Sequence, residues 1–141
     1  MSQEKVNKEL LKYAKEGNLE KFKLLISNDV DIYANNNYLL RFTVIHGNLE
    51  IIKYLVEQKL DIHAQDDFIF KIASYNGHLE VVKFFLFDCK MKIKQETKNW
   101  LIENHQHQTL KLIEKRNLLL KLNKDIIQKD SIDNLNKKVK I

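Results

Sequence analysis

The stretch Gly47-Asn48-Leu49-Glu50-Ile51-Ile52-Lys53-Tyr54-Leu55-Val56 decides the fold, because it is one of three similar copies at one spacing. Its opening, Gly-Asn-Leu-Glu, occurs 30 residues earlier in residues 17–20 and recurs as Gly-His-Leu-Glu 30 residues later in residues 77–80. A second marker, residues 31–34 (Asp-Ile-Tyr-Ala), returns in the same register in residues 61–64 (Asp-Ile-His-Ala). A period of about 20–50 residues is typical of solenoids, in which each unit packs only on its neighbours. The sequence therefore predicts a repeat architecture.

Each repeat is expected to contain two helices. After the glycine, apolar residues are spaced three or four apart, as at Leu49, Ile52 and Leu55, which places them on one helical face. A shorter helix is expected before the glycine, over roughly residues 38–46 and 68–76, and glycine ends it by accepting the left-handed conformation. The side chains just before this helix are of types that favour the N-cap: Asn36, Asn37, Asp66 and Asp67.

The fourth repeat is degenerate but can be traced. One residue inserted just before Met91 aligns Ile93 with Ile62 and Leu101 with Phe70, and it puts Gln108 at the glycine position. Terminal repeats of a solenoid diverge because they turn a polar face outward. We therefore expect an all-α helix-turn-helix solenoid in residues 1–123, with repeats at about 4–33, 34–63, 64–94 and 95–123. A basic extension, partly helical and then frayed, is expected over residues 124–141.

Composition favours helices and gives no sign of a secreted or membrane protein. The chain has 141 residues, three glycines and no proline, which is too few turn-forming residues for a β-sandwich. The single cysteine, Cys89, cannot form an internal disulfide, so the fold does not depend on an oxidising compartment. Residues 1–11 lack the apolar core of a signal peptide, and the apolar cluster at residues 84–87 is too short to cross a bilayer. We expect a soluble, intracellular protein that is not in a membrane.

The positive charge is concentrated near the C-terminus. The net charge is +5, and residues 111–141 hold nine basic and four acidic side chains. Such a segment could bind nucleic acid or another acidic surface, or it could be a solvated helix end. It has no arginine-rich run, no interleaved aromatic residues and no recognised nucleic-acid motif, so nucleic acid is the weaker candidate.

No motif in the sequence predicts catalysis, a cofactor or a metal. There is no glycine-rich phosphate loop, nucleophile elbow or zinc signature. His105 and His107 are separated by one residue, so on a helix they would point in different directions and would make a poor metal pair. We expect both to be exposed at a turn between helices, and we expect the protein not to be an enzyme.

These repeats resemble the ankyrin repeat family. Residues 47–56 and 77–83 look like its second-helix motif, residues 31–34 and 61–64 look like its linker, and the resemblance covers about residues 5–115. The period of 30 is shorter than the usual ~33, and Tyr38-Leu39-Leu40-Arg41 stands where the family has Thr-Pro-Leu-His. The missing residues fall where the β-turn finger projects, so short fingers are expected. Short-fingered, Asn/Lys/Ile-rich repeats are similar to those encoded by giant DNA viruses of amoebae.

The resemblance implies a protein-interaction module that binds an unidentified protein through the groove of the repeats. If the chain is viral, the partner would be a host protein and the protein would be located in the host cytoplasm. We expect the protein to be a monomer or a weak dimer. The first helices and the residues before them supply the candidate contact residues, which are Asn36, Arg41, Phe42, Ile45, Asp66, Lys71, Ile72 and Tyr75. Phe42 and Ile72 could instead pack between adjacent repeats. Arg41 and Tyr75 are expected to be the more exposed.

Overall fold

The 30-residue period of the sequence returns in the structure as a row of paired helices. The computed structural model describes residues 2–26 and 30–140, without the side chains of residues 35 and 36. It contains the helices α1 (Gln3–Glu16), α2 (Leu19–Ile26), α3 (Ala34–His46), α4 (Leu49–Glu57), α5 (Ala64–Tyr75), α6 (Leu79–Lys83), the π-helical segment η1 (Phe84–Asp88), α7 (Gln95–Glu103) and α8 (His107–Val139). The described residues contain no strand, and the prediction of an all-α repeat solenoid is confirmed.

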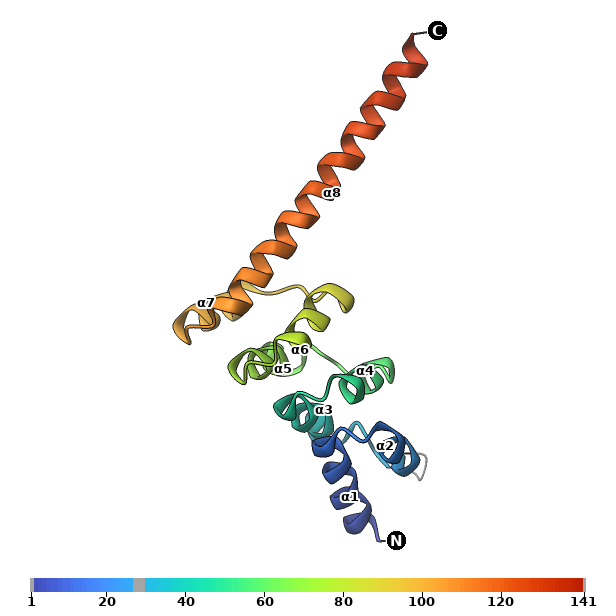
Figure 1. Cartoon of the computed structure of the whole chain (residues 1–141), viewed down its shortest axis with the longest axis vertical. Helices are drawn as coiled ribbons and strands as arrows, with labels where there is room; N and C mark the ends of the chain where they lie inside the picture. The colour runs from blue at the N-terminus through green and yellow to red at the C-terminus, as the bar shows by residue number, and fades with distance from the viewer. Residues whose placement is uncertain (1, 27–29, 141) are drawn as a thin grey trace.

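The helices form two layers. The first helices of the repeats stack in the order α1, α3, α5 and α7, and the second helices α2, α4 and α6 lie beside them (Figure 1). The core lies between the layers and between neighbouring repeats. Equivalent positions are buried every 30 residues. On the first helices these are Leu10, Leu40 and Phe70, and on the second helices they include Phe22 and Ile52. Each repeat thus closes its apolar face against its neighbours, as stacking requires.

The tight turn between the two helices also links neighbouring repeats. Gly47 ends α3 with a φ of 71°, and the next residue along the turn reaches back to the preceding repeat. The Asn48 amide donates to the carbonyl oxygen of Lys15 at 3.0 Å, and the His78 Nε2 donates to that of Ile45 at 2.7 Å. Carbonyl groups at the end of a helix lack partners within the helix. The turn therefore caps the first helix of the repeat before it.

Replacing Gly47 by alanine is expected to lower the free energy of unfolding by about 2–4 kcal/mol. A left-handed φ costs a residue with a Cβ about 1–2 kcal/mol. At this position the new Cβ would also lie 2.5 Å from the His78 ring and would disturb its hydrogen bond to Ile45. Gly77→Ala is the matched control, because Gly77 has a φ of 72° but no atom within 4 Å of its Cβ position. Urea unfolding followed by circular dichroism should show a clearly larger loss for Gly47→Ala, and equal losses would contradict the proposed clash.

The first turn of α5 contains the short finger, residues 65–67, and is built differently from the expected N-cap. Gln65, Asp66 and Asp67 all have left-handed φ values, between 55° and 58°. Asp67 is fully buried, and its carboxylate accepts hydrogen bonds from His63 Nδ1 at 2.8 Å and Thr97 Oγ1 at 3.1 Å. The predicted N-cap role of Asp67 is therefore wrong, since no side chain caps α5. The carboxylate instead joins the finger to α7 in the next repeat.

Asn37 likewise does not cap α3. Its side-chain amide donates to the carbonyl oxygen of Asp61 at 3.1 Å. This hydrogen bond connects the start of α3 to the linker that leads into the next repeat. With short fingers, single polar side chains make the connections between adjacent repeats at this edge. The side chain of Asn36 lies outside the described residues.

Replacing Asp67 by alanine should destabilise the fold by about 2–3 kcal/mol, because the buried Thr97 hydroxyl loses its acceptor and the hydrogen bond to His63 is removed. Asp66→Ala serves as the control for the backbone, since Asp66 has almost the same φ but is exposed. Thermal unfolding of the two variants would separate the effects. Similar melting temperatures for both would show that the buried carboxylate contributes nothing specific.

The fourth repeat follows a different register from the one expected beyond the linker. Its glycine position is occupied by His105, with a φ of 57°, and not by Gln108. The turn hydrogen bond from His78 N to the Ala73 carbonyl has its counterpart in Gln106 N to Leu101. Leu101 therefore takes the position of Ala73 and not that of Phe70. The physical reason is that α7 begins directly after the linker, without counterparts of the three left-handed residues 65–67.

The C-terminal segment is one continuous helix in the structure. Helix α8 spans 33 residues, from His107 to Val139, and extends away from the stack (Figure 1). Residues 124–141 were expected to be partly helical and then frayed, and the described residues are helical to Val139. The helix buries Thr109 and Ile113 against the repeats, whereas its residues from 117 to 139 are exposed. The division of the chain at residue 123 is not marked by any break in this helix, and it stays a prediction.

Candidate partner-binding face

The first helices present one outward face with the same spacing in every repeat. The residues lie at positions i, i+4 and i+7, which share a side of an α-helix. We call this set the front face: Lys8, Lys12, Lys15 on α1; Tyr38, Phe42, Ile45 on α3; Phe68, Ile72, Tyr75 on α5; and Glu96, Trp100, Glu103 on α7. None of these side chains is fully buried, although the neighbouring positions on the same helices form the core.

Apolar and aromatic side chains occupy the middle of the front face. Tyr38, Ile45 and Tyr75 are 44%, 43% and 65% exposed. The Tyr75 and Trp100 rings lie 6.5 Å apart, which connects α5 to α7. The Phe42 ring lies 6.2 Å from that of Tyr38. Aromatic side chains that are held by neighbours while exposing one face are suited to anchor a partner.

The charge of the front face changes along the stack. The α1 positions are all lysines, the α3 and α5 positions are all apolar or aromatic, and two of the three α7 positions are glutamates. The lysines at 8, 12 and 15 and the glutamates at 96 and 103 are exposed. A segment bound along the stack would therefore meet positive charge at one end and negative charge at the other, which fixes its direction.

Arg41 lies less exposed than expected. Its guanidinium group is placed between the rings of Tyr38 and Phe68, at 5.9 and 5.8 Å from their centroids. Its Nη1 donates to the Gln65 Oε1 at 3.2 Å, and its Nε is buried without a hydrogen-bond partner among the described residues. Arg41 was expected to be more exposed than Phe42 and Ile72, but all three are partly buried, because two aromatic rings of adjacent repeats lie near the guanidinium. Arg41 acts first as a link between the second and third repeats.

The other candidates divide into exposed and packed residues. Ile45, Asp66 and Tyr75 are exposed, as a contact role requires. Phe42 and Ile72 are partly buried and pack against the core, which supports the alternative that they join adjacent repeats. Lys71 is half-buried.

Three aromatic residues of the front face were missed from the sequence: Tyr38, Phe68 and Trp100. Tyr38 was assigned only to the altered family signature, and Phe68 only to the range of a predicted helix. Trp100 was missed because the fourth repeat was aligned in the wrong register. The fourth repeat has no counterpart of residues 65–67, so Trp100 aligns with Phe42 and Ile72. An alignment that allowed a spacing of 28 residues after Ile72 would have identified it.

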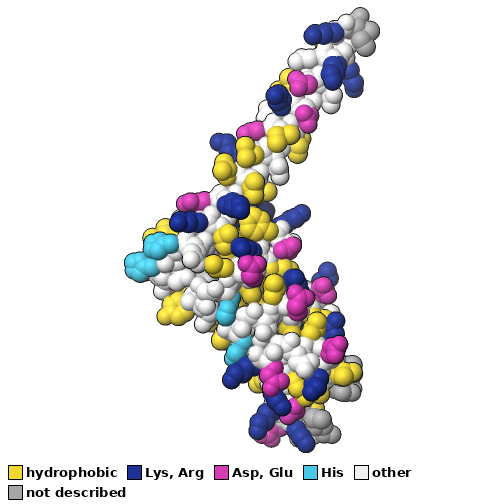
Figure 2. Space-filling view, viewed as in Figure 1, with side chains coloured by type: hydrophobic (Ala, Val, Ile, Leu, Met, Phe, Trp, Pro, Cys, Tyr) yellow, Lys and Arg dark blue, Asp and Glu magenta, His cyan; other side chains and the backbone are white. Residues whose placement is uncertain are grey.

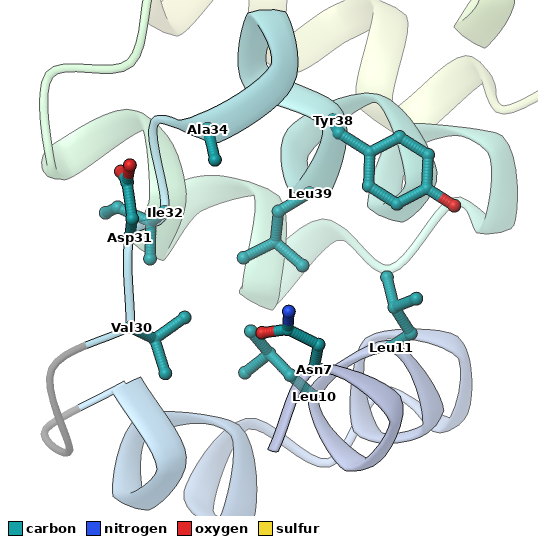
Figure 3. Close-up of a pocket in the computed structure, with 9 residues that line it drawn as sticks. All are labelled: Asn7, Leu10, Leu11, Val30, Asp31, Ile32, Ala34, Tyr38 and Leu39. Atoms are coloured by element: carbon teal, nitrogen blue, oxygen red, sulfur yellow. The ribbon is translucent and has the colours of Figure 1, made fainter. Parts of the chain in front are cut away.

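A small pocket lies between α1 and the linker that leads into α3. Figure 3 shows Leu10 of α1, Val30 of the linker and Leu39 of α3 around it. Its volume is about 180 Å³, below the ~300 Å³ at which small-molecule sites usually begin. The pocket is best explained as a gap left beneath a shortened finger.

Two histidines lie near the last turn between helices. His105 and His107 are exposed, as expected, with ring centroids 6.0 Å apart; Figure 2 shows histidine side chains at the surface both beside α7 and further along the stack. Within residues 2–26 and 30–140, no group of three or more His, Cys, Asp or Glu side chains could hold a metal ion. Over the same residues, no helix is both long and apolar enough to cross a membrane.

Cys89 is expected to react slowly with alkylating reagents. Burial, helped by the neighbouring Asp88 carboxylate, raises the pKa of this thiol from 9.0 to about 11. Because only the thiolate reacts, the reactive fraction below pH 9 is about a hundredfold smaller than for an unshifted thiol. Alkylation by iodoacetamide should therefore be much slower in the folded protein than in urea and should accelerate as the pH rises towards 11. Equal rates in the two states at pH 8 would contradict this account.

A stack of helix pairs with an outward face built from equivalent positions defines a helical-repeat solenoid of the kind used for binding. The chain belongs to the ankyrin repeat family: the family model described as ankyrin repeats, in three copies, matches residues 10–99. Comparison with curated proteins finds no match, and neither does comparison with solved structures. Ankyrin repeats generally mediate protein–protein interaction and are typically non-catalytic.

Proposed function

We propose that this protein is an interaction module whose partner protein lies along the front face. The observation that carries the proposal is the row of large apolar side chains left exposed on successive first helices, Tyr38 and Ile45 on α3 and Tyr75 on α5. Contiguous apolar surface on a folded protein marks a binding site. The supporting contacts are in place before binding, since Tyr75 packs on Trp100 and Tyr38 packs on Phe42.

The charge of the face suggests the chemistry of the partner segment. We propose an apolar or aromatic centre that contacts α3 and α5, an acidic end over the lysines of α1, and a basic end over the glutamates of α7. Complementary charges steer encounter and fix orientation more than they add affinity. Reversing the charge at Lys12 and Lys15 would therefore mainly slow association.

We also propose that the module has no catalytic role and works inside a cell. If the likeness to ankyrin repeats of giant DNA viruses reflects the origin of the chain, the partner is a host protein in the host cytoplasm. The single cysteine is consistent with a reducing compartment.

Affinity capture from a cell lysate, followed by mass spectrometry, tests the proposal. The bait variant combines Ile45→Ala and Tyr75→Ala, both exposed and outside the core. The control is Ile102→Ala, because Ile102 is 58% exposed on α7 but lies two residues from Trp100, on the opposite side of the helix. A protein captured by the wild type and the control but lost from the double variant supports the front face. Capture that the double variant leaves unchanged would count against it.

The basic segment of residues 124–141 remains the alternative binding site, for nucleic acid or another acidic surface. Its lysines are exposed on α8, which supports the idea, but Asp125, Asp130 and Asp133 lie among them. Phosphate contacts release counterions, so such binding would fall steeply with salt. Capture that disappears on nuclease treatment would favour this alternative.

A further inference from the structure

A second candidate surface lies away from the front face, in the corner where α8 leaves the repeats. The groove has a volume of about 490 Å³ and is formed by η1, the loop after it and one side of α8. We call it the corner groove. Its lining residues are Leu86, Phe87, Lys90, Met91, Lys92, Arg116, Leu119, Leu120 and Asn123.

The corner groove exposes apolar side chains from both walls. Phe87 is 36% exposed on η1, and Leu119 and Leu120 are 44% and 53% exposed on α8. Leu120 lies seven residues after the buried Ile113, so it continues the side of α8 that packs on the repeats. Ile127 lies seven residues further along and is also exposed. Helix α8 therefore carries its packing face beyond the end of the surface that covers it, as the hydrophobic side chains along it in Figure 2 show.

The charged groups of the corner groove are all positive. Lys90, Lys92 and Arg116 line it, and no carboxylate is among its lining residues. Arg116 is half-buried, and its Nη1 donates to the carbonyl oxygens of Leu86 and Met91. In the part of the chain that the structure describes, its Nε is buried without a hydrogen-bond partner and no carboxylate pairs with Arg116. A partly buried guanidinium without a counter-ion favours an acidic neighbour.

We propose that the corner groove binds an amphipathic helix of a partner protein, with leucine-like side chains on one face and Asp or Glu at its edges. A helix is about 10–12 Å across, and its apolar stripe can contact Phe87 and Leu120 together. Its carboxylates would meet Lys90, Lys92 and Arg116. This site is separate from the front face and does not depend on the function proposed for it.

Two other occupants fit less well. A flat bilayer is kept away from Leu120 because the repeats stand on the same side of α8, as the shared lining with η1 shows. A second copy of the chain, docked groove to groove, would bring two sets of three cations together. An acidic helix avoids both difficulties.

A displayed library of 18-residue helical peptides tests the proposal. Its positions are varied among Leu, Ala, Gln, Glu and Lys, and the full chain is the target. The test variant is Lys90→Glu/Lys92→Glu, which reverses two exposed groove charges. The control is Lys137→Glu/Lys138→Glu, which makes the same change on α8 outside the groove. Circular dichroism checks that each variant remains folded.

The expected result is enrichment of peptides with Leu at helical spacing and Glu beside it. Their affinity should fall by about tenfold or more in the groove variant and change little in the control. Leu120→Asp should also abolish binding. Enriched peptides without an acidic bias, or equal loss in the two double variants, would overturn the proposal. So would the absence of any enrichment, binding to phosphatidylserine vesicles that depends on Leu120, or a Leu120-dependent dimer in sedimentation.

Discussion

Replacing Phe70 by alanine should lower the free energy of unfolding by about 3–5 kcal/mol, because it removes a fully buried ring from the middle of the stack. Phe70 lies on α5, which contacts α3 on one side and α7 on the other. A cavity there would weaken two repeat interfaces at once, and a solenoid depends on such nearest-neighbour contacts. Small domains are stabilised by only about 5–15 kcal/mol, so the variant should be close to unfolding.

Urea unfolding followed by far-ultraviolet circular dichroism measures this loss. Ile127→Ala is the control, since Ile127 is 66% exposed on α8 and its truncation should change the free energy of unfolding by less than about 0.5 kcal/mol. A loss below ~1 kcal/mol for Phe70→Ala would mean that α5 does not sit between two packed repeats.

Truncation of Tyr75 or Trp100 is expected to weaken the affinity for the captured partner by about tenfold to a hundredfold. Aromatic anchors at the centre of an interface commonly contribute on this scale. Tyr75 is 65% exposed, so its loss should leave the fold intact and act on binding alone. Trp100 is half-buried, and for Trp100→Ala the stability must be measured beside the affinity.

The two residues should not act independently. Their rings lie 6.5 Å apart, and residues in contact usually show a coupling energy in a double-mutant cycle. Isothermal titration calorimetry on Tyr75→Ala, Trp100→Ala and the double variant would measure it. Ile102→Ala on the other side of α7 should bind like the wild type, and a loss equal to that of Tyr75→Ala would move the interface away from the front face.

The repeats themselves could be predicted from the sequence because their period is strict. Identical spacing of the glycines and of the apolar positions is enough to place α3 to α6 and most of the core. The front face could be found in part, since Ile45 and Tyr75 follow from helical spacing. Exposure could not be predicted for Arg41, because its cover depends on rings that belong to two different repeats.

The errors concentrate where the period breaks. Compared with the 30-residue period of the earlier repeats, the fourth repeat has one extra residue in the region of the π-helical segment η1. It also lacks the three finger residues before α7. Those changes move Trp100 into the front face and His105 into the glycine position. The buried role of Asp67 depends on Thr97 in the next repeat, and a single repeat viewed as an isolated unit gives no sign of it.

Photo-crosslinking from the front face tests the central claim most directly. A benzoylphenylalanine placed at Tyr75 is compared with one placed at Ile102, on the other side of α7 from Trp100, in the full chain mixed with the captured partner. The account predicts a covalent adduct with the partner from position 75 and little or none from position 102. An adduct from position 102 alone would contradict the claim that the partner lies along the front face.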